Sequence, residues 1–237
     1  MRRILAVLGA IGLGCTALTG CVASPPPLAA FTPPAPPPSP TAAAPSLDAR
    51  MLTEARHFVY RVRSVACLAV GSSFSTSSGI ITNRHVAQGS AIVQLATWSG
   101  DDFQADVDAL SPGPDLAELT ADREGLPDAP IDTTRVAAGT PVWVAGYPEG
   151  DQLTVTHGVA VGYVDARWIG QPEKVLEITA AVRHGNSGGP VLDADGKVIA
   201  VVFAISPKNG DGLAIPASAV ARFERAPGAL TDVGCLE

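Results

Sequence analysis

The sequence predicts an all-β fold in which short strands form a pair of barrels, with a short helix before them and another after them. Strand-like apolar segments recur along the chain, separated by turns that contain proline, glycine or aspartate, at 91–97, 141–146, 153–164, 174–182 and 197–205. Helical patterns are confined to two short segments. Many short strands with little helix are typical of barrels.

The two predicted helices lie at the ends of the strand-rich region. Ser46 is a good N-cap and Asp48 falls in the first turn, which predicts a helix over 47–55. Pro216 suits the start of the second helix, 216–225. The first helix places three apolar residues on one face: Met51, Leu52 and Ala55.

The start of the chain has the pattern of a bacterial export signal. Arg2 and Arg3 are followed by an apolar run, 4–18, which is short for a membrane span. The sequence Leu-Thr-Gly-Cys then resembles a lipobox ending at Cys21. This resemblance implies cleavage before Cys21 and lipid attachment to its thiol. An ordinary signal peptide that contains a cysteine is the alternative.

Composition divides the chain into three parts. Residues 1–20 are the predicted lipoprotein signal peptide. Residues 21–45, rich in proline and alanine, are a linker that reaches roughly 70 Å as a polyproline helix of ~3.1 Å per residue. Residues 46–237 form the remaining domain, which is long enough for two barrels.

The acidic charge excludes some partners. The formal net charge is −7, and loss of the signal peptide removes Arg2 and Arg3 but no acid, leaving 14 basic against 23 acidic residues, or −9. We therefore expect no nucleic-acid binding and no electrostatic attachment to anionic lipid. The membrane contact is expected through lipidated Cys21.

One glycine-rich segment carries the predicted chemistry. Residues 185–190, Gly-Asn-Ser-Gly-Gly-Pro, place Ser187 where the chain can turn sharply on both sides. Such a turn lets the amides of Gly185 and Ser187 point at one spot, where an oxyanion can be stabilised. A plain turn is the alternative for the segment taken alone.

A base and an acid precede Ser187 in the order expected for a catalytic triad. His85 follows the short apolar run 79–81, and Asp115 comes 30 residues later. Leu116 and Leu119 flank Asp115 with apolar anchors, which suits a buried carboxylate. Four other acids compete for this role: Asp101, Asp102, Asp106 and Asp108. The order His, Asp, Ser is that of the chymotrypsin arrangement.

On these motifs the chain resembles the trypsin-like (chymotrypsin-fold, S1) serine peptidases in their bacterial HtrA-like form, whose wording is TN-x-HV, D-x-A-x-L and GNSGGP. The resemblance implies two six-stranded antiparallel β-barrels, a triad of His85, Asp115 and Ser187, and an oxyanion hole made by Gly185 and Ser187. It implies no cofactor. The peptide-binding PDZ module of the HtrA relatives is expected to be absent.

A finer resemblance concerns the flanking segments. Residues 59–64 leading to Cys67, 201–204, and a terminal Gly-Cys pair ending at Cys235 are similar to the protease domain of the actinobacterial periplasmic acid-resistance serine proteases. A disulfide links the corresponding positions in that family, and two cysteines in an exported domain favour one disulfide. Two buried free thiols are the alternative. The membrane-spanning domain of that family is expected to be absent here, and Asn186 replaces a common aspartate.

The family alignment also suggests a substrate pocket. Ala181 falls at its base, where an acid would select Arg or Lys, so small or medium apolar side chains are expected instead. His184 falls at the mouth, and Ala204 is assigned to the same pocket. The segment 193–196 resembles the start of a calcium loop but is expected to be a hairpin turn, and no metal site is expected.

The sequence thus predicts an exported serine endopeptidase, lipid-anchored at the outer face of the cell membrane, that acts on proteins or peptides of the cell envelope. One alternative is a binding or sensing module with the same fold and an unassembled site. Another is an esterase using the same triad, although the chain order and the all-β pattern disfavour it.

The anchor can be tested by replacing Cys21. We expect Cys21→Ser to release the protein from membranes or to block its maturation, because stable attachment requires acyl chains on that thiol. Fractionation of cells and intact-mass measurement check this. An unmodified Cys21 in the mature wild-type protein would contradict the prediction.

Overall fold

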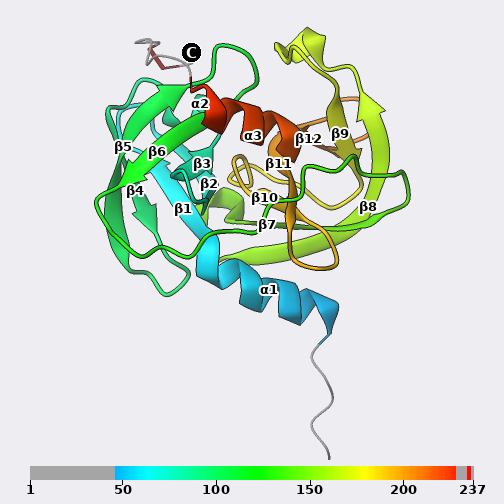
Figure 1. The fold of residues 1–237 in the computed structure, drawn as a ribbon, viewed down its shortest axis with the longest axis horizontal. Coiled ribbons are helices and arrows are strands. Elements are labelled where there is room, and N and C mark those ends of the chain that lie inside the picture. Colours follow the sequence, from blue (N-terminus) through cyan, green and yellow to red (C-terminus); the bar gives the residue numbers. More distant parts are fainter. Residues whose placement is uncertain (1–45, 228–233, 236–237) are drawn as a thin grey trace, which may run out of the picture. The chain divides into compact units, whose positions relative to one another are not determined.

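The computed structural model describes residues 46–227 and 234–235 (Figure 1). It opens with helix α1 (Leu47–Phe58), whose N-cap Ser46 accepts a hydrogen bond from the Ala49 N–H at 3.2 Å. The helix runs three residues beyond the predicted end because Phe58 continues its buried face. Asp48 accepts a hydrogen bond from Trp143 Nε1 at 2.8 Å, which attaches α1 to the second barrel.

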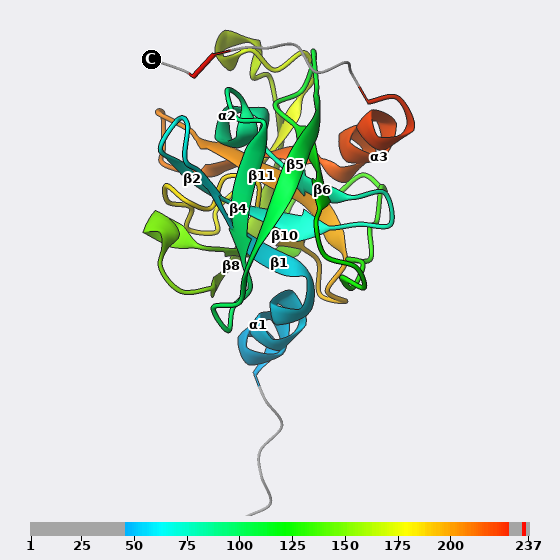
Figure 2. The ribbon, with the colours of Figure 1, turned by 90° about the vertical axis from the view of Figure 1, so that its left-hand side faces the viewer.

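The first barrel closes in the strand order β1-β2-β3-β6-β5-β4, with all neighbours antiparallel. Figure 2 looks onto this barrel, with β4 and β5 towards the viewer. Alternate residues of β5 point inward, so Phe103, Ala105 and Val107 are buried. The short helix α2 (Arg84–Ala87) follows β3. The strands are β1 (Val59–Ser64), β2 (Ala69–Ser75), β3 (Ile80–Thr82), β4 (Ile92–Ala96), β5 (Asp102–Leu110) and β6 (Ala117–Ala121).

The second barrel closes in the order β10-β11-β12-β9-β8-β7, again antiparallel. Helix α3 (Ala217–Arg225) starts after Pro216, as predicted, and packs on β11 and β12. The predicted pair of six-stranded barrels is therefore confirmed. The strands are β7 (Pro141–Gly146), β8 (Thr154–Val164), β9 (Val175–Ile178), β10 (Pro190–Leu192), β11 (Val198–Ile205) and β12 (Gly212–Pro216), and two 3-10 turns are η1 (Pro148–Gly150) and η2 (Arg167–Ile169).

Some strands differ from their predicted extents. The segment predicted over 174–182 keeps strand structure only in β9, and the residues after Ile178 turn towards the serine segment. Strand β2 escaped prediction because small polar residues occupy buried positions on both of its faces: Ser72 and Ser73 are fully buried. Their burial is imposed by the closed barrel and not by an apolar pattern.

A disulfide joins Cys67 to Cys235, 168 residues apart in the sequence. Chain-entropy models give a loop of that length about 4–5 kcal/mol of stabilisation. The predicted signal peptide and linker, including Cys21, lie outside the described residues. Among the helices that the structure describes, none is both long enough and apolar enough to cross a membrane.

Glu118 of β6 is half-buried beside two other carboxylates. Burial, and the negative charges of Glu224 and Asp108, raise the pKa of the Glu118 carboxyl above its ordinary value. The folded protein therefore holds this proton more tightly than the unfolded chain does. Protonation of Glu118 therefore contributes to the free energy of unfolding. This contribution is fully present below the pKa of the unfolded chain, about 4.3, and is lost as pH rises through the pKa of the folded protein.

We expect Glu118→Gln to raise the melting temperature at pH 7, because the amide removes a charge that the fold disfavours. The difference should shrink to near zero as pH falls below about 4, where the wild-type carboxyl is protonated. Thermal melts from pH 3.5 to 7.5 check this. Glu124→Gln, at an exposed position, is the matched control. A gain that does not depend on pH would contradict the prediction.

Candidate functional site

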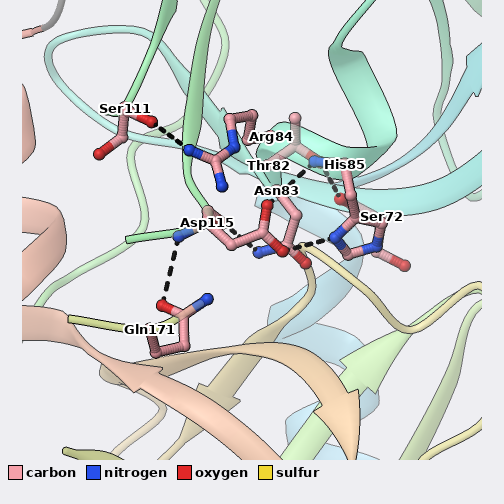
Figure 3. Close-up of polar contacts among 8 residues, drawn as sticks. All are labelled: Ser72, Thr82, Asn83, Arg84, His85, Ser111, Asp115 and Gln171. Carbon is pink, nitrogen blue, oxygen red and sulfur yellow. Dashed lines mark hydrogen bonds and ion pairs between the residues drawn. The ribbon is translucent and has the colours of Figure 1, made fainter. Parts of the chain in front are cut away.

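His85 lies in the first turn of α2, which follows β3 directly. Its backbone N–H donates to Asp115 Oδ1 at 2.9 Å, and its ring Nδ1 lies 2.5 Å from Asp115 Oδ2 (Figure 3). Asp115 is buried. A carboxylate that accepts from both groups of one residue orients the imidazole, and a proton on Nδ1 leaves Nε2 as the free acceptor.

The backbone of Asp115 is held on both sides. Asn83 Nδ2 donates to the Asp115 carbonyl oxygen at 2.8 Å, and the Asp115 N–H donates to Gln171 Oε1 at 3.3 Å (Figure 3). Leu116, the predicted apolar anchor, is fully buried next to it. The competing acids do not reach His85, and their side chains are exposed: Asp101, Asp102, Asp106 and Asp108.

Ser187 lies in a turn that has no room for a β-carbon at Gly185. That glycine has a φ of 90°, and a Cβ there would lie 2.3 Å from the Tyr147 carbonyl oxygen. The His184 carbonyl accepts a hydrogen bond from the Glu149 N–H at 2.7 Å. Because C=O and N–H point in opposite directions across a trans peptide, the Gly185 N–H points away from Glu149.

Two amides of this turn are available to a ligand. Within the part of the chain that the structure describes, neither the Gly185 N–H nor the Ser187 N–H donates to any acceptor. The amide after Ser187 is used, since the Gly188 N–H donates to the Val202 carbonyl at 2.8 Å. Two free donors in the same turn as a serine hydroxyl can stabilise a negatively charged oxygen.

Ser72 of β2 links the serine turn to the first barrel. Its N–H donates to the Ser187 carbonyl at 2.7 Å, and its hydroxyl donates to the Gly185 carbonyl at 2.7 Å. The same hydroxyl accepts from the Tyr147 N–H at 2.9 Å. Ser72 is fully buried, so these bonds have no competition from water. They set the position of Ser187 relative to the barrel that carries His85 and Asp115.

A pocket of about 560 Å³ brings these groups together. His85, Asp115 and Ser187 all line it, and so do the predicted pocket residues His184 and Ala204. Among the hydrogen bonds of residues 46–227, none joins the Ser187 hydroxyl to the His85 ring. Such contacts are often long in unliganded sites and shorten when substrate binds. The other lining residues are Ile169, Val182, Arg183, Phe203 and Ile205.

Ala181 does not line this pocket, contrary to its expected place at the base. Its side chain is exposed, and its carbonyl accepts a hydrogen bond from Thr156 Oγ1 at 2.8 Å. Val182, one residue further on, faces the pocket instead. Strand β9 ends at Ile178, so the alternation of a strand no longer decides where these side chains point.

Comparison with known proteins identifies the family. A family described as the trypsin-like peptidase domain matches residues 70–201, which is more than half of the chain. The chain belongs to the trypsin-like peptidase family. The matched segment runs from β2 into β11. It contains the pocket residues from His85 to Ser187, and the remaining three, 203–205, lie just beyond its end.

The relatives of this trypsin-like peptidase include bacterial proteases of the HtrA type. Serine protease HhoB of Synechocystis is 35% identical over 155 residues, which cover 62% of this chain and 37% of HhoB. Serine protease Rv3671c of Mycobacterium tuberculosis is 33% identical over 190 residues, which cover 74% of this chain and 47% of that protein. The chain thus spans less than half the length of these curated relatives.

Solved structures agree with the fold. The active form of the Rv3671c protease superposes with a TM-score of 0.70 at 28% identity, covering 87% of this chain and 97% of that one. The HtrA-type protease AlgW with a tripeptide gives a TM-score of 0.71 at 27% identity, covering 77% of this chain and 63% of that one.

Two residues of the site carried no signal in the sequence. Ser72 stands in a run of small polar residues, and Gln171 stands in a loop between β8 and β9. Neither residue type is typical of a catalytic group, and both act through hydrogen bonds to backbone atoms of distant segments. Only the closure of the two barrels brings them to the site.

We expect Ser72→Ala to lower the free energy of unfolding by about 1–2 kcal/mol, because it leaves a buried N–H and a buried carbonyl without their partner. The reaction of Ser187 with a fluorophosphonate probe should slow as the turn loosens. Chemical denaturation and labelling kinetics check both effects. Ser73→Ala is the matched control, since its hydroxyl makes one long contact, 3.4 Å, to the Tyr60 carbonyl. Equal labelling rates in the two variants would contradict the prediction.

Proposed function

We propose that the protein is an exported serine endopeptidase. The observation that carries the proposal is the contact between His85 Nδ1 and Asp115 Oδ2, 2.5 Å, in the same pocket as Ser187. The two free amides of the serine turn add a place for the oxyanion. Membership of the trypsin-like peptidase family supports the same reaction.

In the proposed mechanism Ser187 attacks the carbonyl carbon of the scissile peptide bond. His85 takes the hydroxyl proton through Nε2 and later gives it to the leaving amine. Asp115 keeps the proton of the ring on Nδ1 and stabilises the imidazolium. The Gly185 and Ser187 N–H groups donate to the oxyanion of the tetrahedral intermediate. A water molecule, activated by His85, then attacks the ester carbonyl of the acyl-enzyme and releases the acyl group from Ser187.

The lining of the pocket suggests the substrate class. Val182, Phe203 and Ala204 present apolar surface near Ser187, and Asp115, the acid in the pocket, is already bonded to His85. We infer that the residue before the scissile bond has a small or medium apolar side chain, because an unpaired cation has no partner there. Proteins or peptides of the cell envelope are the proposed substrates.

The proposed location rests on the start of the sequence. Arg2, Arg3 and the apolar run 4–18 suit an export signal, and Cys21 suits lipid attachment. The Pro/Ala-rich linker 21–45 would hold the domain away from the membrane surface. A relative from Chlamydia pneumoniae, 32% identical over 161 residues, is named a periplasmic serine endoprotease, which supports export.

A second candidate is a binding or sensing module with the same fold and a resting site. The missing hydrogen bond between Ser187 and His85 in the described residues favours it. The two candidates differ in reactivity, because a resting site does not react with an electrophile that needs an activated serine. Labelling with a fluorophosphonate therefore separates them.

We expect Ser187→Ala and His85→Ala each to abolish most peptide turnover and fluorophosphonate labelling, and the double variant to be little worse, because the residues act as a unit. Asp115→Asn should lower kcat about 10⁴-fold, the loss known for the same geometry elsewhere. Asp108→Asn is the matched control, since its side chain is exposed. Damage by Asp108→Asn with a silent Asp115→Asn would overturn the assignment of the acid.

A further inference from the structure

The loop between β8 and β9 reaches from the second barrel to Asp115 in the first. Gln171 in this loop is 3% exposed, and its Oε1 accepts the hydrogen bond of the Asp115 N–H at 3.3 Å (Figure 3). A buried side-chain amide requires a hydrogen-bond partner of this kind. Figure 3 shows the amide directed at the backbone of Asp115 and not at its carboxylate.

This bond is the sole hydrogen bond from the second barrel to the loop 111–116 within the described residues. The other bonds that reach the loop come from the first barrel. Asn83 Nδ2 donates to the Asp115 carbonyl, and an Arg84 guanidinium nitrogen donates to the Ser111 carbonyl at 2.8 Å. Gln171 therefore supplies a link that the first barrel does not supply for itself.

The local structure of the loop places Gln171 accurately. Residues of η2 form a tight turn on Ala166, whose carbonyl accepts the Ile169 and Gln171 N–H groups at 3.0 and 3.2 Å. Ala166 is fully buried. Gly170 has a φ of 80°, which reverses the chain between the two donors. Ile169 lines the substrate pocket, so one short turn touches both the pocket and Asp115.

We propose that Gln171 is a positioning residue that holds Asp115 in register with His85 across the junction of the barrels. Asp115 makes two bonds to His85, one to the backbone N–H and one to the ring, and both require a fixed backbone at Asp115. The acceptor oxygen of Gln171 supplies one of the two restraints on that backbone. The inference rests on the proposed function, because it acts through the base and acid of that mechanism.

The test uses Gln171→Met, which keeps the length of the side chain but has no acceptor oxygen. Gln104→Met is the matched control, since Gln104 is exposed on β5. We use the full-length protein, a fluorophosphonate probe, and the fluorogenic peptide with an apolar residue before the scissile bond that the wild type hydrolyses fastest. Rates are normalised to the number of serines that the probe titrates.

We expect Gln171→Met to lower kcat and the labelling rate about tenfold, the rate equivalent of one hydrogen bond, because a less restrained Asp115 orients the His85 ring less well. KM should stay within about twofold, because the residue does not contact substrate. Gln104→Met should match the wild type. A general loss of packing would lower the number of titrated serines and not the rate for each one.

Turnover by Gln171→Met within twofold of the wild type overturns the proposal, and so does a loss of turnover that is fully matched by a loss of titrated serines. If Gln171→Met does not fold, Gln171→Asn decides by the same criteria, because it is one methylene too short to reach the Asp115 N–H. Wild type and Ser187→Ala are measured alongside. Equal rates in wild type and Ser187→Ala refute the proposed function itself. If the wild type is faster than Ser187→Ala but the Gln171 variants match the wild type, only the inference is refuted.

Discussion

The alignment of the two barrels at Ser72 is the constraint on which the site depends. His85 and Asp115 belong to the first barrel and Ser187 to the second, so no element of local structure sets the distance between them. Ser72 bonds to the Ser187 carbonyl through its N–H and to the Gly185 carbonyl through its hydroxyl. Because Ser72 is fully buried, these bonds are not exchanged for bonds to water.

The serine turn is shaped by exclusion as much as by attraction. A Cβ at Gly188 would lie 2.1 Å from the Ser72 carbonyl oxygen, and one at Gly185 would lie 2.3 Å from the Tyr147 carbonyl oxygen. Both glycines also have a positive φ that other residues rarely adopt. Close approach of the backbones and a left-handed conformation therefore occur together, and they leave the amides of Gly185 and Ser187 free.

Asp115 shows how a buried carboxylate is accommodated. Burial of an unpaired charge is strongly unfavourable, and His85 offers it two donors while Asn83 and Gln171 hold its backbone. The Asn83 Oδ1 atom is the one buried side-chain oxygen or nitrogen without a partner in the described part of the chain. The polar side chains near the acid therefore hold Asp115 and His85 in place, and the side-chain oxygen of Asn83 is left without a hydrogen bond.

The sequence by itself determined the fold class, the family and the three groups of the proposed triad. Strand-length apolar segments and the order of His85, Asp115 and Ser187 along the chain can be recognised in the sequence without knowledge of the packing. It also identified Cys67 and Cys235 as a pair, which the structure joins. The extents of β7 and β8 followed from their flanking turns.

Only the tertiary structure decided which side chains surround that triad. Ser72 and Gln171 contact backbone atoms 113 and 56 residues away, and no periodicity links such positions. Val182 replaces Ala181 in the pocket because the chain leaves strand geometry after Ile178, where a pattern of alternation stops predicting direction. The sequence shows which side-chain groups the protein has. Which of those groups contact one another depends on the closure and docking of the two barrels.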